Sequence, residues 1–386
     1  MRYRLIWLIL LPVLLMLCVS CSDDEEVVPK LNIYVYAPDR AAITRGEIAP
    51  SEKEAPIYNL QIWVFRSSDP SKLVASLTLT TEEELKGLNE QKSASYSIAL
   101  RKEERSFADH PEPVDIYVLA NVLNNNGTNY FETINTGADI EKAVFDGGHF
   151  FNFLIPSAYQ AATTVPDGKG IPLSGVARGK SVIDRDNVLH VNDANLKLTR
   201  TVSKIRFVAS SLDATDIDPI FIEEINLNPN LMYKKERFFL DDDHPSYWVE
   251  GTPFTEKVLL VRGDRNNPVA MIDDPVKYAY SSSMSDEDYE KLINEGVSDG
   301  ELTEFGPVYL PESDKRLSGT ITFRIGGANR QTLTAPFSMT TGNFHRNQTW
   351  IVYAYYIGSS KLVVNSVQVV DWEDTDLQLD HDVPNW

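Results

Sequence analysis

Short segments with the alternating pattern of β-strands recur along the whole chain, and they constrain its fold more than any other feature. Apolar side chains recur at every second residue, or nearly so, in residues 31–37, 57–65, 114–121 and 361–372. Successive side chains of a strand point to opposite faces, so a period of two predicts strands with a buried face. Segments rich in Pro, Gly and Asn separate them. We therefore expect an all-β chain with a few short helices.

Two helices are predicted between the strands. The first follows Thr81, whose side chain forms a capping box with Glu84. The second covers residues 285–295 and stops at Gly296, a residue type that commonly ends helices. Both are decorations on a β-rich body.

Length and charge bound the architecture and the partners. The 386 residues, 42% of them hydrophobic, suffice for two domains, which we place at residues 46–195 and 196–386, with the boundary near Asn195. The formal net charge of −20 excludes nucleic acid as a partner. An acidic, self-repelling surface favours association by backbone pairing and apolar burial.

The first twenty residues predict export. Arg2 and Arg4 precede an apolar run over residues 5–19, which is the pattern of a secretory signal peptide. About 15 apolar residues fall short of the ~20 that a membrane-spanning helix needs. Cys18 and Cys21 are the only two cysteines, so the body is predicted to have neither a disulfide nor a reactive thiol.

The segment after the apolar run resembles a bacterial lipobox, with Ser20 just before Cys21. The segment departs from a lipobox at Cys18, which stands where Leu is usual, although Leu17 lies one place away. We predict lipidation of Cys21, which small Ser20 precedes, with Cys18 as the weaker alternative. Residues 22–26, of which four are acidic, form a solvated tether. They also resemble the signal for display on the outer face of the outer membrane in Bacteroides-type bacteria.

The order of these features resembles that of one protein family. A lipidated cysteine, an acidic tether, a strand, a Pro-rich linker containing arginines, and then the strand that begins at Asn59 are the layout of fimbrillins, the subunits of Bacteroidales type V pili. Residues 114–121, which end in Ala120-Asn121, resemble a fimbrillin strand. Residues 343–372, which end in Asp371-Trp372, resemble the closing hairpin of that family.

The resemblance implies a fold, a processing event and partners. The fold is two tandem transthyretin-like Greek-key β-sandwich domains. An arginine-specific protease cuts between Arg45 and Gly46, or less favourably at Arg40, within a lipidated propeptide of residues 21–45. The cut releases the first strand, and a strand from another copy or a related pilus subunit takes its place. The residues given these roles are Leu31, Ile33, Val35 and Ala37 in the released strand and Val363, Val367 and Val369 in the candidate donor strand.

Several alternatives stay open. Residues 361–372 could be an ordinary last strand of their own domain, and the linker arginines could be mere linker charges in an anchor subunit that keeps its first strand. The lipid would hold the protein at the outer membrane before processing. The alternative from another class is a surface lipoprotein that binds glycans, for which Tyr233, Tyr247 and Trp248 are the candidate aromatic cluster.

No residue pattern supports an enzyme, a cofactor or a metal centre. Residues 175–181 resemble a phosphate-binding loop but are one residue short and are not followed by a helix pattern. The six histidines lack metal-ligand spacing. Calcium at Asp241–Asp243 or Asp273–Asp274 is left open, although solvated turns explain both runs. Arg262-Gly263-Asp264 is an adhesive tripeptide that a turn also explains.

Overall fold

The computed structural model describes the chain between residues 28 and 371, with gaps. The described residues are 28–38, 54–122, 134, 136–142, 144–146, 154–155, 158–159, 165, 167–185, 188–192, 196–211, 220–240, 245–263, 266–272, 303–326, 331–339, 344–356 and 362–371. The predicted signal peptide, Cys18, Cys21, Arg40, Arg45, Gly46, both aspartate runs and the predicted helix at residues 285–295 lie outside them.

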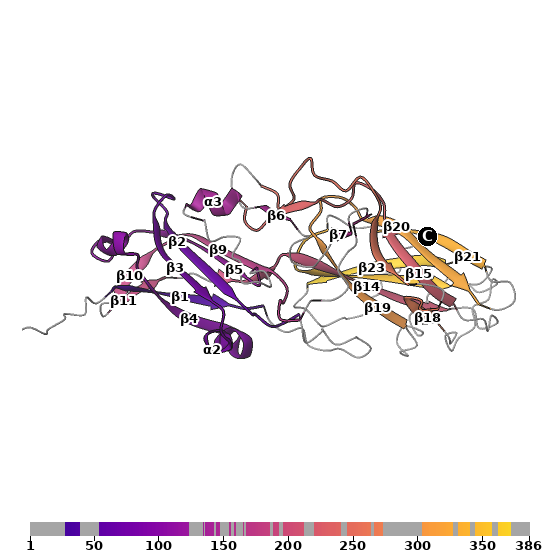
Figure 1. The fold of residues 1–386 in the computed structure, drawn as a ribbon, viewed down its shortest axis with the longest axis horizontal. Coiled ribbons are helices and arrows are strands. Elements are labelled where there is room, and N and C mark those ends of the chain that lie inside the picture. Colours follow the sequence, from indigo (N-terminus) through magenta and orange to yellow (C-terminus); the bar gives the residue numbers. More distant parts are fainter. Residues whose placement is uncertain are drawn as a thin grey trace, which may run out of the picture.

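Four main sheets form two β-sandwiches that lie end to end (Figure 1). The first sandwich has one sheet of β10 (Val182–Arg185), β11 (Val188–Val191), β1 (Lys30–Tyr36), β12 (Leu196–Lys197) and β4 (Ser93–Ala99), and a second of β13 (Thr199–Arg200), β9 (Leu173–Lys180), β5 (Val114–Ala120), β2 (Leu60–Arg66) and β3 (Leu73–Leu79). The predicted all-β class is confirmed.

The second sandwich uses strands from the C-terminal half. One sheet contains β19 (Thr303–Pro311), β14 (Val202–Ser211), β22 (Gln348–Tyr356) and β23 (Leu362–Asp371), and the other contains β17 (Val258–Arg262), β15 (Ile220–Leu227), β20 (Ser318–Ile325), β21 (Gln331–Ser338) and β18 (Ala270–Ile272). Pairing passes from the first sandwich to the second between β13 and β14. The predicted domain limits at residues 195 and 196 stay a prediction.

Short elements decorate the sandwiches. Two small sheets pair β16 (Lys235–Arg237) with β6 (Val144–Asp146) and β7 (Leu154–Ile155) with β8 (Ala158–Tyr159). The helical segments are α2 (Glu82–Lys86), a π-helical turn (Gly87–Gln91), a 3-10 helix (Lys102–Phe107) and α3 (Gly137–Lys142). The predicted capping box is confirmed: the Thr81 hydroxyl accepts from the backbone N–H of Glu84, whose carboxylate accepts from that of Thr81.

Strand β2 is apolar on both faces because it lies between two cores. Leu60, Ile62 and Val64 belong to the core of the first sandwich. Trp63 and Phe65 point to the other face, into an apolar cluster that continues into the second sandwich. Burial on both faces explains why the segment reads as a continuous apolar run rather than a strict alternation.

The structure explains why β5 is followed by Asn121. Its backbone has the left-handed φ of 59°, which Asn tolerates better than most residues. Its side-chain amide donates to the carbonyl oxygens of Pro56 (3.0 Å) and Ile171 (2.9 Å), and its Oδ1 accepts from the backbone N–H of Tyr58 (2.8 Å). Gly170, with φ of +65°, passes so close that a Cβ there would overlap the Asn121 amide. Asn121 thus ties three chain segments together at the end of β5.

We expect Asn121→Ala to lower the free energy of unfolding by about 2–4 kcal/mol, because buried carbonyl groups lose their donors and Ala is strained at this φ. Denaturant unfolding measures the change. Asn230→Ala is the matched control, since Asn230 has φ of 63° but is exposed. It should cost about 1 kcal/mol, and equal losses in the two variants would contradict the bonding role of Asn121.

Candidate functional site

The first strand of the described chain occupies the middle of its sheet. β1 pairs antiparallel with β4 through seven residue pairs, from Lys30 opposite Ala99 to Tyr36 opposite Ser93. Its other edge pairs parallel with β11 and β12. Further backbone bonds hold both ends, among them Leu198 N–H to Tyr36 O (2.8 Å). Both edges of β1 are therefore bonded within the chain.

β1 also supplies one side of the first core. Leu31, Ile33 and Val35 are fully buried, and Ala37 is 7% exposed. Each of the three larger side chains contributes roughly 1.5–3 kcal/mol by leaving water. The alternate residues Tyr34 and Tyr36 are 49% and 40% exposed on the outer face. Removing β1 would therefore open an apolar groove between β4 and β11–β12. Side chains of the first core would line its floor, and unpaired backbone groups would line both sides.

The chain that follows β1 returns to the junction between the two sandwiches. Fifteen residues, 39–53, separate the described segments on either side and include Arg40 and Arg45. Just after them, the Glu54 carboxylate accepts from Lys204 Nζ of β14 (3.1 Å) and from the Tyr309 hydroxyl of β19 (2.6 Å). All three side chains are buried. Burial lowers the pKa of Lys204, an effect that the nearby Glu54 carboxylate opposes.

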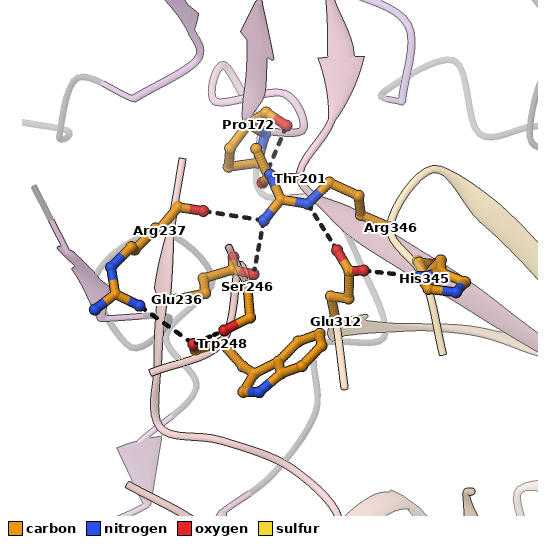
Figure 2. A network of polar contacts seen from close by, with 10 residues as sticks. Pro172, Thr201, Glu236, Arg237, Ser246, Trp248, Glu312, His345 and Arg346 are labelled. Carbon is orange, nitrogen blue, oxygen red and sulfur yellow. Dashed lines mark hydrogen bonds and ion pairs between the residues drawn. The ribbon is translucent and has the colours of Figure 1, made fainter. Parts of the chain in front are cut away.

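A second buried group of charges lies at the same junction (Figure 2). Arg346 Nε donates to Glu312 Oε2 (3.1 Å), and Arg346 Nη2 lies 3.6 Å from Glu236 Oε2. The guanidinium also covers the Tyr247 ring, 3.3 Å from its centroid. His345 Nδ1 is 2.8 Å from the other oxygen of Glu312. The Arg346 cation thus stands between the carboxyl groups of Glu312 and Glu236.

Glu236 is the carboxylate that this arrangement leaves protonated at neutral pH. Burial raises the pKa of Glu236 to about 8, the Arg346 charge opposes the rise, and the Glu312 charge adds to it. With Glu236 neutral, the charges of Glu312 and Arg346 cancel. Because β16, which contains Glu236, pairs with β6 from the first half of the chain, this cluster helps to hold the two halves together.

We expect Glu236→Gln to change the pH dependence of stability. A carboxyl group whose pKa is higher in the folded than in the unfolded protein stabilises the fold while it is protonated. This contribution is complete at pH values below the pKa of the unfolded state, near 4.5. That contribution is lost as the pH rises toward 8. The variant, which keeps a neutral amide, should unfold at a higher urea concentration than the natural protein at pH 9 and gain less or nothing at pH 5. A difference that stays constant from pH 5 to pH 9 would contradict the assignment.

The structure separates the three aromatic residues considered for glycan binding. The rings of Tyr233 and Trp248 stack, with centroids 6.2 Å apart and planes 21° apart. Tyr247 instead packs under Arg346.

The adhesive tripeptide Arg262-Gly263-Asp264 is described only in part. The Arg262 guanidinium bonds the Glu224 carboxylate (2.6 Å), and Asp264 lies outside the described residues.

The candidate donor residues Val363, Val367 and Val369 lie in β23, at the edge of the second sandwich. β23 pairs with β22 of the same chain, from Asp371 opposite Gln348 to Leu362 opposite Tyr356. The register of this pairing shifts between Val364 and Ser366, so the regular alternation of the strand is interrupted there. A donor role for this strand stays a prediction.

Metal and membrane features were also sought among the described residues. These contain no group of three or more His, Cys, Asp or Glu side chains arranged to hold a metal ion. Nor does any helix within the described ranges have the length and apolar character needed to cross a membrane.

Comparison with solved structures gives the fold class. A candidate cell adhesion protein from Parabacteroides distasonis matches with a TM-score of 0.54 at 16% identity, over 89% of this chain and 97% of that one. The tip fimbrial protein Mfa3 from Porphyromonas gingivalis, truncated at its C-terminus, gives 0.49 at 14% identity, over 89% and 99%. The fimbrial anchor protein Mfa2 from the same organism gives 0.39 at 11% identity, over 89% and 98%.

The match with the Parabacteroides candidate cell adhesion protein agrees in fold with the fimbrillin resemblance. At 16% identity, the Parabacteroides match establishes a common all-β fold over nearly the whole of both chains. No protein-family model and no curated protein matches the sequence.

Proposed function

We propose that the protein is a subunit of a cell-surface fimbrium, exported as a lipoprotein on Cys21 and assembled by strand exchange. A protease cuts after Arg45, β1 leaves, and a strand from a neighbouring subunit enters the groove. The protein acts as a structural and adhesive component rather than as an enzyme. The fold shared with a candidate cell adhesion protein supports this class of function.

The observation that carries the proposal is the central position of β1. A strand at a sheet edge could be lost at little cost, but a central strand leaves two open edges and an open core. Such a groove is unstable in water and favours an incoming strand, whose backbone bonds supply affinity and whose alternate side chains supply specificity. Leu31, Ile33, Val35 and Ala37 would leave the positions that the incoming strand must fill.

Glu54 fixes the chain on the C-terminal side of the proposed cleavage site. The buried bonds to Lys204 and Tyr309 hold the chain nine residues after Arg45. The chain from Glu54 onward would therefore stay attached to the junction after the cut. Cleavage can then release β1 without loosening β2.

Digestion of the precursor with an arginine-specific protease tests the processing step. Intact mass should show one early cut at Arg45 and release of the segment that contains β1 when subunits associate. Arg45→Ala should block both events, whereas Arg40→Ala, the matched control, should block neither. Early cleavage elsewhere in the folded chain, or unchanged association of Arg45→Ala, would contradict the proposal.

A further inference from the structure

An excursion of the second sandwich fixes two aromatic rings beside exposed basic residues. Residues 230–237 and 247–254 run antiparallel, with backbone bonds such as Lys234 N–H to Thr252 O (2.8 Å) and Val249 N–H to Lys235 O (3.0 Å). Across this hairpin, the rings of Tyr233 and Trp248 stack and are only partly buried. The backbone pairing gives both rings a rigid support.

The polar partners of Tyr233 hold it in place. Its hydroxyl donates to Asp314 Oδ1 (2.8 Å), and Lys315 Nζ bonds Asp314 Oδ2 (2.8 Å). Both oxygens of Asp314 are therefore engaged. The ring cannot turn away without breaking this chain of bonds, so its orientation is set before any ligand arrives.

The charge around the two rings is opposite to that of the whole protein. Exposed basic residues stand next to Tyr233 and Asp314 in sequence: Lys234, Lys235, Lys315 and Arg316. The described acidic residues nearby are Glu250, which is exposed, Asp314, which is engaged, and Glu236 and Glu312, which are buried beside Arg346. In a chain of net charge −20, this local excess of cations favours an anionic ligand.

We propose that Tyr233, Trp248, Lys315 and Arg316, which we call the aromatic–basic patch, bind an acidic saccharide. The flat apolar face of a pyranose ring packs on an aromatic ring, and its carboxylate or sulfate pairs with the cations. Aromatic faces that give contact area, together with a few fixed polar groups that give orientation, are the usual composition of such sites. The patch lies in the second sandwich, so it operates whether or not β1 is exchanged.

Calorimetric titration of the purified protein tests the patch, with sialyllactose as the carboxylated probe, sulfated lactose as the sulfated probe and lactose as the neutral one. At least one acidic probe should bind roughly tenfold or more tightly than lactose. Its affinity should fall as salt rises, because the cations are exposed. Comparing the affinities for sialyllactose and sulfated lactose shows whether the patch prefers a carboxylate or a sulfate.

Variants locate the binding. Trp248→Ala should weaken the preferred acidic probe about tenfold, by loss of a stacking surface. Lys315→Ala, at an exposed position that leaves the fold intact, should weaken it several-fold and reduce the salt dependence. Tyr58→Ala and Lys102→Ala, exposed residues of the first sandwich, are the controls and should bind normally. Equal binding of lactose, unchanged affinity in Lys315→Ala, or no binding of either acidic probe at millimolar concentration would overturn the proposal.

Discussion

Replacing Ile33 with aspartate should lower the free energy of unfolding of the unprocessed protein by more than about 4 kcal/mol. Ile33 is fully buried in the middle of β1, where the core offers a new carboxylate no partner. The loss should appear in denaturant unfolding of the unprocessed chain. If strand exchange operates, the same change should have no effect on assembled fibres, because Ile33 leaves with β1.

The neighbouring residue provides the control for Ile33. Tyr34→Asp places the same carboxylate on the same strand, but on its outer face, where Tyr34 is 49% exposed. It should change the stability by less than about 1 kcal/mol. Similar losses for both variants would mean that β1 is not held by its buried face. A fibre weakened by Ile33→Asp would mean that β1 is kept in the assembled subunit.

Removing the buried charge of Lys204 at the junction should cause the second largest loss of stability. Lys204→Met leaves the buried Glu54 carboxylate without its lysine partner, which costs about 3–5 kcal/mol. Adding Glu54→Gln removes the unpaired charge, so the double variant should recover most of the loss. Denaturant unfolding of the two single variants and the double variant measures the coupling.

An exposed pair serves as the reference for this cycle. Arg101 and Glu103 form a salt bridge of 2.6 Å, but their side chains are 40% and 58% exposed. Arg101→Ala should cost no more than about 0.5 kcal/mol, as is usual for surface pairs. If Lys204→Met cost as little, or if the double variant were as unstable as Lys204→Met alone, the bond between Glu54 and Lys204 would not hold the chain at the junction.

Local pattern predicted much of the fold. Residues 114–121 were expected as a strand from their apolar alternation, and they form β5 over Val114–Ala120. The capping box at Thr81 depends on two residues three positions apart, so it too could be recognised locally. Ala120-Asn121 was recognised only as a family resemblance, and the left-handed turn explains why Asn stands there.

Strand β4 shows where local pattern fails. This strand begins at Ser93, three residues before its first large apolar side chain, Tyr96. Ser93, Ala94 and Ser95 have little preference for strands, and they adopt that conformation because each pairs with a residue of β1. The pairing partner, not the residue type, decides the structure.

The charged groups of the junction had no recognisable signal in the sequence. Glu54 was read as part of the exposed Pro-rich linker, and its partner Lys204 is 150 residues away. Glu236 and Glu312 are single acidic residues among many in an acidic chain. Burial and pairing over such separations depend on the packing of the two sandwiches, which no local pattern contains.

A reversible lock on β1 tests strand exchange most directly. Tyr34 and Ser95 are exposed partners on β1 and β4, at the spacing of an antiparallel pair, which is within reach of a disulfide. Tyr34→Cys with Ser95→Cys can therefore be oxidised to hold β1 in place. After cleavage at Arg45, electron microscopy should show no fibres from the oxidised variant and normal fibres once a reductant is added. Equal fibre formation in both states would contradict the exchange of β1.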